Sequence, residues 1–103
     1  MIVSDFLEWQ DSGYYIGPNE STEKLAFYYA VTSIAYYKHY VSLVPDGIYD
    51  LLCKHLLLRH GLPLWLDKES LAAGTGYAVN PPIAAHKAAT ELIENTNWMM
   101  FDE

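Results

Sequence analysis

Three side chains near the middle of the chain have residue types and a spacing that could bind a polar ligand. Asp46 follows Pro45, and Tyr49 and Asp50 lie three and four residues beyond Asp46. If Asp46 is the N-cap of a helix, the three side chains share one face, because residues three and four apart in a helix are neighbours. Two carboxylates and a phenol would then meet at a helix start, which predicts a small polar pocket there.

Two tyrosines precede this corner in the sequence. Tyr36 and Tyr37 lie near the end of an aromatic segment, and the short connection 42–45 joins it to the helix that starts at Asp46. A connection of this length predicts an antiparallel helical hairpin. We therefore expect both aromatic rings to face the carboxylates of the corner.

Each of these residues also has a structural explanation without a ligand. An aspartate before a helix is commonly an N-cap worth about 1 kcal/mol. A stripe of tyrosines is commonly core, with its hydroxyls reaching the surface. As a general acid and base, Asp46 and Asp50 lack an accompanying nucleophile. The sequence therefore predicts a binding pocket and not a catalytic centre.

Three further patterns do not predict sites. Cys53 and His55 are two residues apart and His55 and His60 are five apart, so neither pair projects from one helix face as zinc ligands would. The glycines at 74–76 have no following Lys-Ser or Lys-Thr, which a phosphate loop requires. The sequence accordingly predicts no metal.

The apolar pattern predicts an all-α fold, a small bundle of four to five helices around a central helical hairpin at about 22–60. The segment 24–41 is apolar almost all round, which is typical of a central helix. Residues 62–66 are expected to form an extended apolar strap across the bundle, and the apolar tail 98–101 to pack back or to join subunits of a homo-oligomer. The predicted helices begin at Ser4, at Ser21 or Thr22, at Asp46, at Asp67 and at Asn80–Pro82, and end near Tyr14, Val41, Arg59, Ala73 and Glu94 or Asn95.

Composition restricts the class of protein. At 103 residues the chain is expected to be one domain, 1–103, and its single cysteine suits a reducing compartment. The net charge of −7 argues against direct nucleic-acid binding, because a phosphate backbone needs compensating Lys and Arg. Residues 24–60, with four Lys or Arg against two acids, are the mildly basic part, which would suit a phosphate-bearing ligand. No secretion signal or membrane-spanning run is recognisable, so we expect a cytoplasmic location and no membrane.

The motif AYY, a short loop and then P-D-x-x-Y-D-x-L-x-x-x-L, over residues 35–56, resembles the N-terminal helical hairpin, subdomain Ia, of bacterial NAD-dependent DNA ligases. In that family the hairpin holds the nicotinamide mononucleotide half of NAD while the adenylate is transferred to a lysine in the next domain. The resemblance implies a stand-alone module that binds nicotinamide mononucleotide or NAD. The contacts it implies are Tyr36, Asp46, Tyr49 and Asp50, with Tyr37 where the family often has His.

The chain departs from the ligase family in its chemistry. The family's K-x-D-G motif is absent, since no lysine is followed by Asp two positions on and then Gly. Without that nucleophile the chain is not expected to be an enzyme. It could instead be an accessory subunit for a separately encoded nucleotidyltransferase.

A different class of function also fits the composition. A small acidic protein can engage a basic site on another protein, and it can imitate a phosphate backbone. In this alternative the chain is a non-enzymatic interaction module, for example a virus-encoded inhibitor of a nucleic-acid-binding or defence enzyme, acting in the host cytoplasm.

Overall fold

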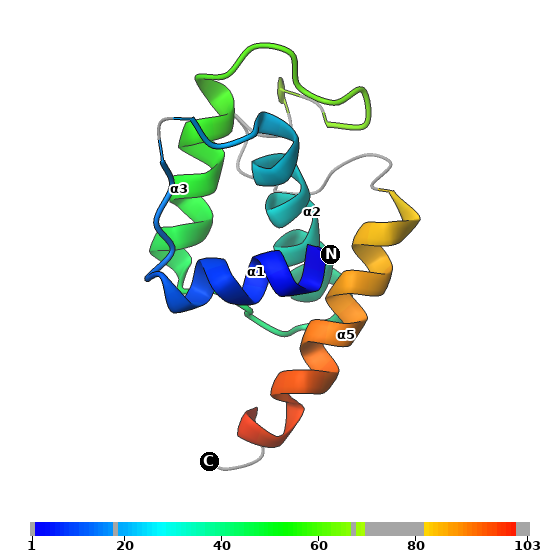
Figure 1. Ribbon diagram of the computed structural model, residues 1–103. Helices are drawn as coiled ribbons and strands as arrows, with labels where there is room; N and C mark the ends of the chain where they lie inside the picture. The colour runs from blue at the N-terminus through cyan, green and yellow to red at the C-terminus, as the bar shows by residue number, and fades with distance from the viewer. Residues whose placement is uncertain (1, 18, 67, 70–81, 101–103) are drawn as a thin grey trace.

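The computed structural model describes residues 2–17, 19–66, 68–69 and 82–100, with side chains described for all of these except 2, 46 and 95–100. Within them the chain forms four helices and no strand, so the all-α prediction is confirmed. Figure 1 shows their arrangement. The helices are α1 (Ile2–Asp11), α2 (Thr22–His39), α3 (Asp46–Leu57) and α5 (Ile83–Met100).

Helix α2 is the element against which the others pack. Almost every residue from Leu25 to Ala35 is buried, and both α3 and α5 contact this helix. Its start is fixed by Ser21, the N-cap, whose side chain accepts a hydrogen bond from the amide of Lys24 at 3.3 Å. A helix that is apolar all round needs cover on several sides, and α2 has it, as the sequence predicts.

The end of α2 differs from its predicted end at Val41. The helix ends at His39 because Tyr40 adopts a left-handed conformation with φ 59°. The amide of Val41 then donates to the carbonyl of Ala35 at 2.9 Å, which turns the chain away from the helix axis. This turn starts the connection to α3.

Helix α3 begins one residue earlier than its predicted capping implies. Pro45 is the N-cap, and its carbonyl accepts hydrogen bonds from the amides of Ile48 at 2.9 Å and Tyr49 at 3.2 Å. Asp46 is therefore the first helical residue, and its assignment as the N-cap was wrong. The helix also ends at Leu57 instead of Arg59.

Helix α1 covers one side of α2 through aromatic contacts. The ring of Trp9 stacks on Tyr28 with centroids 4.7 Å apart, and Phe6 meets Tyr28 edge to face at 5.5 Å. The predicted bounds of this helix were wrong at both ends. Ser4 lies inside the helix and does not cap it, and the chain turns at Gly13, φ 79°, before Tyr14.

Helix α5 approaches α2 through small residues. Ala85, Ala88 and Ala89 are all buried, together with Leu92. The helix continues to Met100, beyond the predicted end near Glu94. The side chains of the apolar tail 98–101 and the helix start at Asn80 and Pro81 lie outside the described residues, as does most of the helix predicted from Asp67.

The segment 62–66 covers the core but is not extended. The amide of Leu66 donates to the carbonyl of Pro63 at 3.0 Å, which makes a turn where an extended strap was expected. Leu66 is buried, and Leu62 and Trp65 pack against the core. No helix in the described part of the chain is long and apolar enough to cross a membrane.

Candidate functional site

A cavity of about 240 Å³ lies where the end of α2, the connection 42–44 and the start of α3 meet. Four of the five predicted site residues line it, namely Tyr36, Tyr37, Tyr49 and Asp50. The side chain of the fifth, Asp46, lies outside the description. The structure therefore brings the two tyrosines of α2 and two residues of α3 to one place. The other lining residues are Thr32, Ser42, Leu43, Val44 and Cys53.

Tyr36 and Tyr37 supply aromatic surface at the mouth of this cavity. Their ring centroids are 5.0 Å apart and their planes are nearly perpendicular, at 87°. The side chains remain 53% and 40% exposed, so part of each ring is available to a ligand. An edge-to-face pair leaves ring surface exposed, on which a planar ligand can stack.

Tyr49 is held in position by two contacts across the α2–α3 interface. Its hydroxyl and that of Ser33 are 2.6 Å apart and share a hydrogen bond in which either can donate. Its ring stacks on Tyr29 with centroids 5.2 Å apart and an interplanar angle of 18°. Burial raises the pKa of Tyr49 to about 12, against the hydrogen bond from Ser33, which lowers it. The phenol is therefore neutral at physiological pH.

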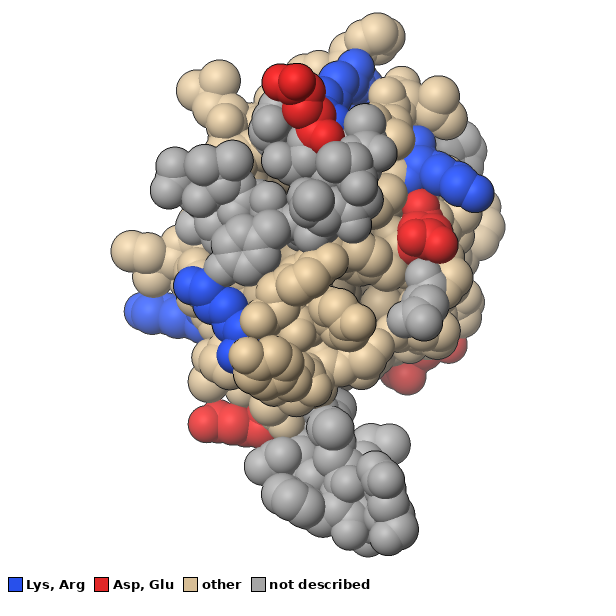
Figure 2. All heavy atoms as spheres, turned by 180° about the vertical axis from the view of Figure 1, so that it is seen from behind, with Lys and Arg blue, Asp and Glu red and all other residues tan. Residues whose placement is uncertain are grey.

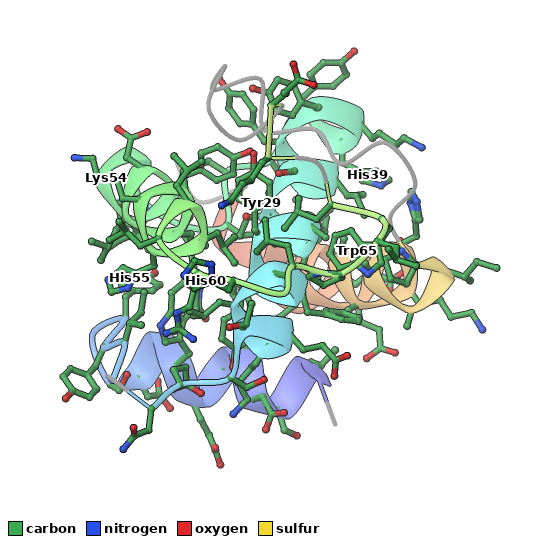
Figure 3. The ribbon with its side chains drawn as sticks, turned by 90° about the horizontal axis from the view of Figure 1, so that it is seen from above. Tyr29, His39, Lys54, His55, His60 and Trp65 are labelled. Carbon is green, nitrogen blue, oxygen red and sulfur yellow. The ribbon has the colours of Figure 1, made fainter. Side chains whose placement is uncertain are left out.

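Tyr29 lies behind Tyr49 with its side chain fully buried. Figure 3 shows it between α2 and α3. Its hydroxyl lies close to the hydroxyl of Tyr49 and the thiol of Cys53 but makes no hydrogen bond of ordinary geometry among the described residues, and burial raises its pKa far above the usual range of a tyrosine. A buried hydroxyl without a partner costs about 1–3 kcal/mol. This is the one polar group beneath the cavity that the fold leaves unsatisfied within the described part of the chain.

Cys53 lines the inner wall but is a poor nucleophile there. Burial raises the pKa of its thiol, and the nearby charge of Asp50 raises it further. Since only the thiolate reacts readily, this environment suppresses the chemistry of Cys53. The described residues also contain no group of three His, Cys, Asp or Glu side chains placed to hold a metal ion.

The charge of the cavity is negative, contrary to the expectation from the basic balance of residues 24–60. Asp50 is the single charged side chain among its described lining residues. Lys24 lies at the other end of α2, 3.6 Å from Glu20, and Arg59 lies beyond the far end of α3. The expectation was wrong because a sum over a segment does not show which charged side chains line a cavity. Lys38 lies in the last turn of α2, at the cavity end, yet it is not among the lining residues.

Sequence reasoning missed Thr32, Ser33 and Cys53 as parts of this site. Ser33 lies three and four residues before the two tyrosines at the mouth, which places all three on one helix face. That spacing was visible in the sequence, whereas the hydrogen-bond partner of Ser33 was not. The Trp65 segment, which was expected to cross the bundle, is not among the lining residues.

No family model, curated protein or solved structure matches this chain. The ligase resemblance therefore stays a prediction that depends on the residues themselves. What the geometry offers chemically is an aromatic mouth, one carboxylate and a neutral phenol around a small cavity. These groups can stack on and orient a planar ligand, and they include no activated nucleophile.

Proposed function

We propose that the cavity between α2 and α3 binds the nicotinamide ring of nicotinamide mononucleotide or NAD, and that the chain catalyses no reaction by itself. In this proposal α2 and α3 act as the hairpin of a stand-alone module similar to ligase subdomain Ia. One observation supports it most: Tyr36, Tyr37, Tyr49 and Asp50, implied by the resemblance, line a single cavity.

The groups around the cavity match the charge of an oxidised nicotinamide ring. That ring is planar and positively charged, and a cation over an aromatic face gains about 0.5–2 kcal/mol. The carboxylate of Asp50 adds an opposite charge at the mouth, worth roughly 0.2–1 kcal/mol for an exposed pair. No Lys, Arg or His lines the cavity among the described residues, so no cationic side chain of the lining repels a positively charged ring.

The size of the cavity limits how much of the ligand it can enclose. Its 240 Å³ is below the roughly 300–1,000 Å³ of most ligand pockets. We therefore expect the ring to enter and the ribose and phosphate to remain at the surface. Stacking with two or three hydrogen bonds corresponds to a binding free energy of about −4 to −8 kcal/mol, or millimolar to micromolar affinity.

Thermal unfolding with added nucleotide tests the proposal. A ligand at 100 times its dissociation constant stabilises the folded chain by about 2.7 kcal/mol, a rise of several degrees in Tm for a chain of this size. Asp50→Asn should lower this stabilisation by roughly 0.2–1 kcal/mol, the contribution of an exposed charge pair, whereas Asp11→Asn, at an exposed aspartate on α1, should leave it unchanged. An unchanged Tm for the native chain at millimolar nicotinamide mononucleotide and NAD would reject the proposal.

A second candidate is a protein-interaction module that binds a basic partner. Exposed acids along α1 and at the start of α2 support it, namely Glu8, Asp11 and Glu23. The face shown in Figure 2 instead carries charges of both signs, some of them side by side, so this partner would use the face with α1. Affinity capture should then recover a complex that dissociates as the salt concentration rises. In this case the Tm of the chain should not change when nucleotides are added.

A further inference from the structure

A second cavity, shallow and open to solvent, with a volume of about 300 Å³, lies beyond the opposite end of α3. It is formed by the loop that leaves α3 and by the next described segment. Figure 3 shows His60 just after this end of the helix, with His55 on the same side of α3. The described residues that line it are Arg59, His60, Gly61, Leu62, Leu66 and Lys68.

The charge of this cavity is the reverse of that of the whole chain. The chain has 13 acidic residues against 6 Lys and Arg, yet Arg59 and Lys68 both line the cavity and His60 lies between them. No Asp or Glu is among its described lining residues. Like charges that gather around a hollow repel one another, and an anion within reach of them relieves that repulsion.

Arg59 is fixed in place by acceptors that do not neutralise it. Its Nη1 donates to the backbone carbonyl of Glu20 and to the hydroxyl of Thr22, the latter at 3.1 Å. Both acceptors are uncharged groups. The carboxylate of Glu20 lies instead 3.6 Å from the ammonium of Lys24. The guanidinium is therefore positioned in advance while its charge is still available to a ligand.

The surroundings strengthen the effect of these charges. Leu66 is buried and Leu62 is partly buried, so one wall of the cavity is apolar. Charges interact more strongly beside an apolar wall than in open water. Gly61, at φ 72°, provides the left-handed turn that carries the chain past Arg59 and into this wall.

A purely structural explanation accounts for only part of the cluster. Cationic side chains next to a helix end interact favourably with its negative dipole, which fits Arg59 and His60. That effect fades within the last turn, and Lys68 belongs to a later segment of the chain. The helix end alone therefore does not explain why Lys68 joins the other two.

We infer that this cavity is a binding site for a small oxyanion, a phosphate group carried either by inorganic phosphate or by a phosphate monoester. Arginine presents a fork of N–H donors that matches phosphate oxygens, and lysine adds a point charge. The site shares no residue with the cavity at the start of α3. It therefore stands whether or not the chain binds a pyridine nucleotide.

The test is an amide NMR titration of the full chain with inorganic phosphate, and then with a phosphate monoester such as phenyl phosphate, at constant ionic strength. We expect saturable shifts at the amides of Gly61 and Leu62. Lys68→Ala and His60→Ala remove exposed side chains without a described packing role. Lys68→Ala should weaken phosphate binding about tenfold, and His60→Ala less.

Lys54→Ala is the matched control, because it removes the same charge from α3 without touching the cavity. Figure 3 shows Lys54 on the other side of the helix from His60. If Lys54→Ala weakens binding as much as Lys68→Ala, the effect is one of net charge and the site is rejected. Shifts that grow linearly with phosphate, or that chloride reproduces, would overturn it too. Phosphate monoester binding without inorganic phosphate binding would assign the ester alone.

Discussion

The two ends of α3 carry opposite chemistry. At its start lie aromatic rings and Asp50, with no cationic side chain among the described lining residues. Beyond its end lie Arg59, His60 and Lys68, with no described acid. The helix dipole favours an anion at the first end and cations at the second. Of the four Lys and Arg in residues 24–60, only Arg59 is among the described lining residues of either cavity, so the mildly basic composition of this segment does not describe the charge of either site.

The two ends also differ in how they are fastened to α2. At the start of α3, the hydroxyl pair of Ser33 and Tyr49 and a stacked ring hold the helix. Beyond its end, Arg59 reaches back to the first residues of α2. One end is held by neutral aromatic packing and the other by a charged side chain. Substitutions that remove the contacts at one end of α3 should therefore leave the contacts at the other end intact.

The largest effect should come from a core residue of α3. Leu56 is fully buried in α3, and Leu56→Ala should lower the free energy of unfolding by about 2–5 kcal/mol, because it leaves a cavity in the core. Urea unfolding measures this loss. The control Leu51→Ala, on the exposed side of the same helix, should cost less than about 1 kcal/mol. Equal losses would show that α3 is not packed as described.

High pH should destabilise the start of α3, where Tyr49 packs against α2. Tyr49 has a folded-state pKa of about 12 against 10.0 for an unperturbed tyrosine, so the folded state holds this proton more tightly than the unfolded chain does. The stability that follows is complete below pH 10 and is lost as pH rises through 12. Urea unfolding from pH 8 to 12 should show the decline, and Tyr49→Phe should make it less steep. Part of the decline should remain, because burial also raises the folded-state pKa values of Tyr28, Tyr29 and Cys53. An unchanged slope in the variant would contradict this assignment.

The charge of the nicotinamide ring should determine how tightly the nucleotide binds in the cavity at the start of α3. NAD and its reduced form differ at the nicotinamide ring, which loses its positive charge on reduction. We expect NAD to bind about tenfold more tightly, equivalent to about 1.4 kcal/mol. Asp50→Asn should narrow the difference, and Lys68→Ala, at the opposite end of α3, should leave it unchanged. Calorimetric titration gives both constants, and equal affinity for the two forms would remove Asp50 and the aromatic rings as charge-sensing contacts.

The smallest effect on stability should come from removing the hydroxyl of Tyr49 or of Tyr29. Tyr49→Phe leaves the hydroxyl of Ser33 without its described partner and should cost about 1 kcal/mol. Tyr29→Phe removes a buried hydroxyl that has no described partner and should be neutral or stabilising. Urea midpoints at pH 7 compare the pair. A loss on Tyr29→Phe as large as that on Tyr49→Phe would mean that the Tyr29 hydroxyl is satisfied in solution.

The sequence predicted most of the helices because their signals are local. Ser21 at the start of α2 and Pro45 before α3 each act on neighbouring backbone, so the starts of these helices follow from nearby residues. The ends were less accurate. The left-handed turn at Tyr40 and the continuation of α5 to Met100 carry no strong glycine or proline signal at those positions.

By itself the sequence determined that the chain is helical, that α2 is surrounded by other helices, and that Tyr49 and Asp50 share the first part of α3. Only the tertiary structure decided that Ser33 bonds to Tyr49, that no lysine is among the described residues lining the cavity at the start of α3, and that Lys68 lies with Arg59 in the cavity beyond its end. The reason is physical. Apolar periodicity acts over one or two helical turns, whereas contacts between distant segments depend on how whole helices pack.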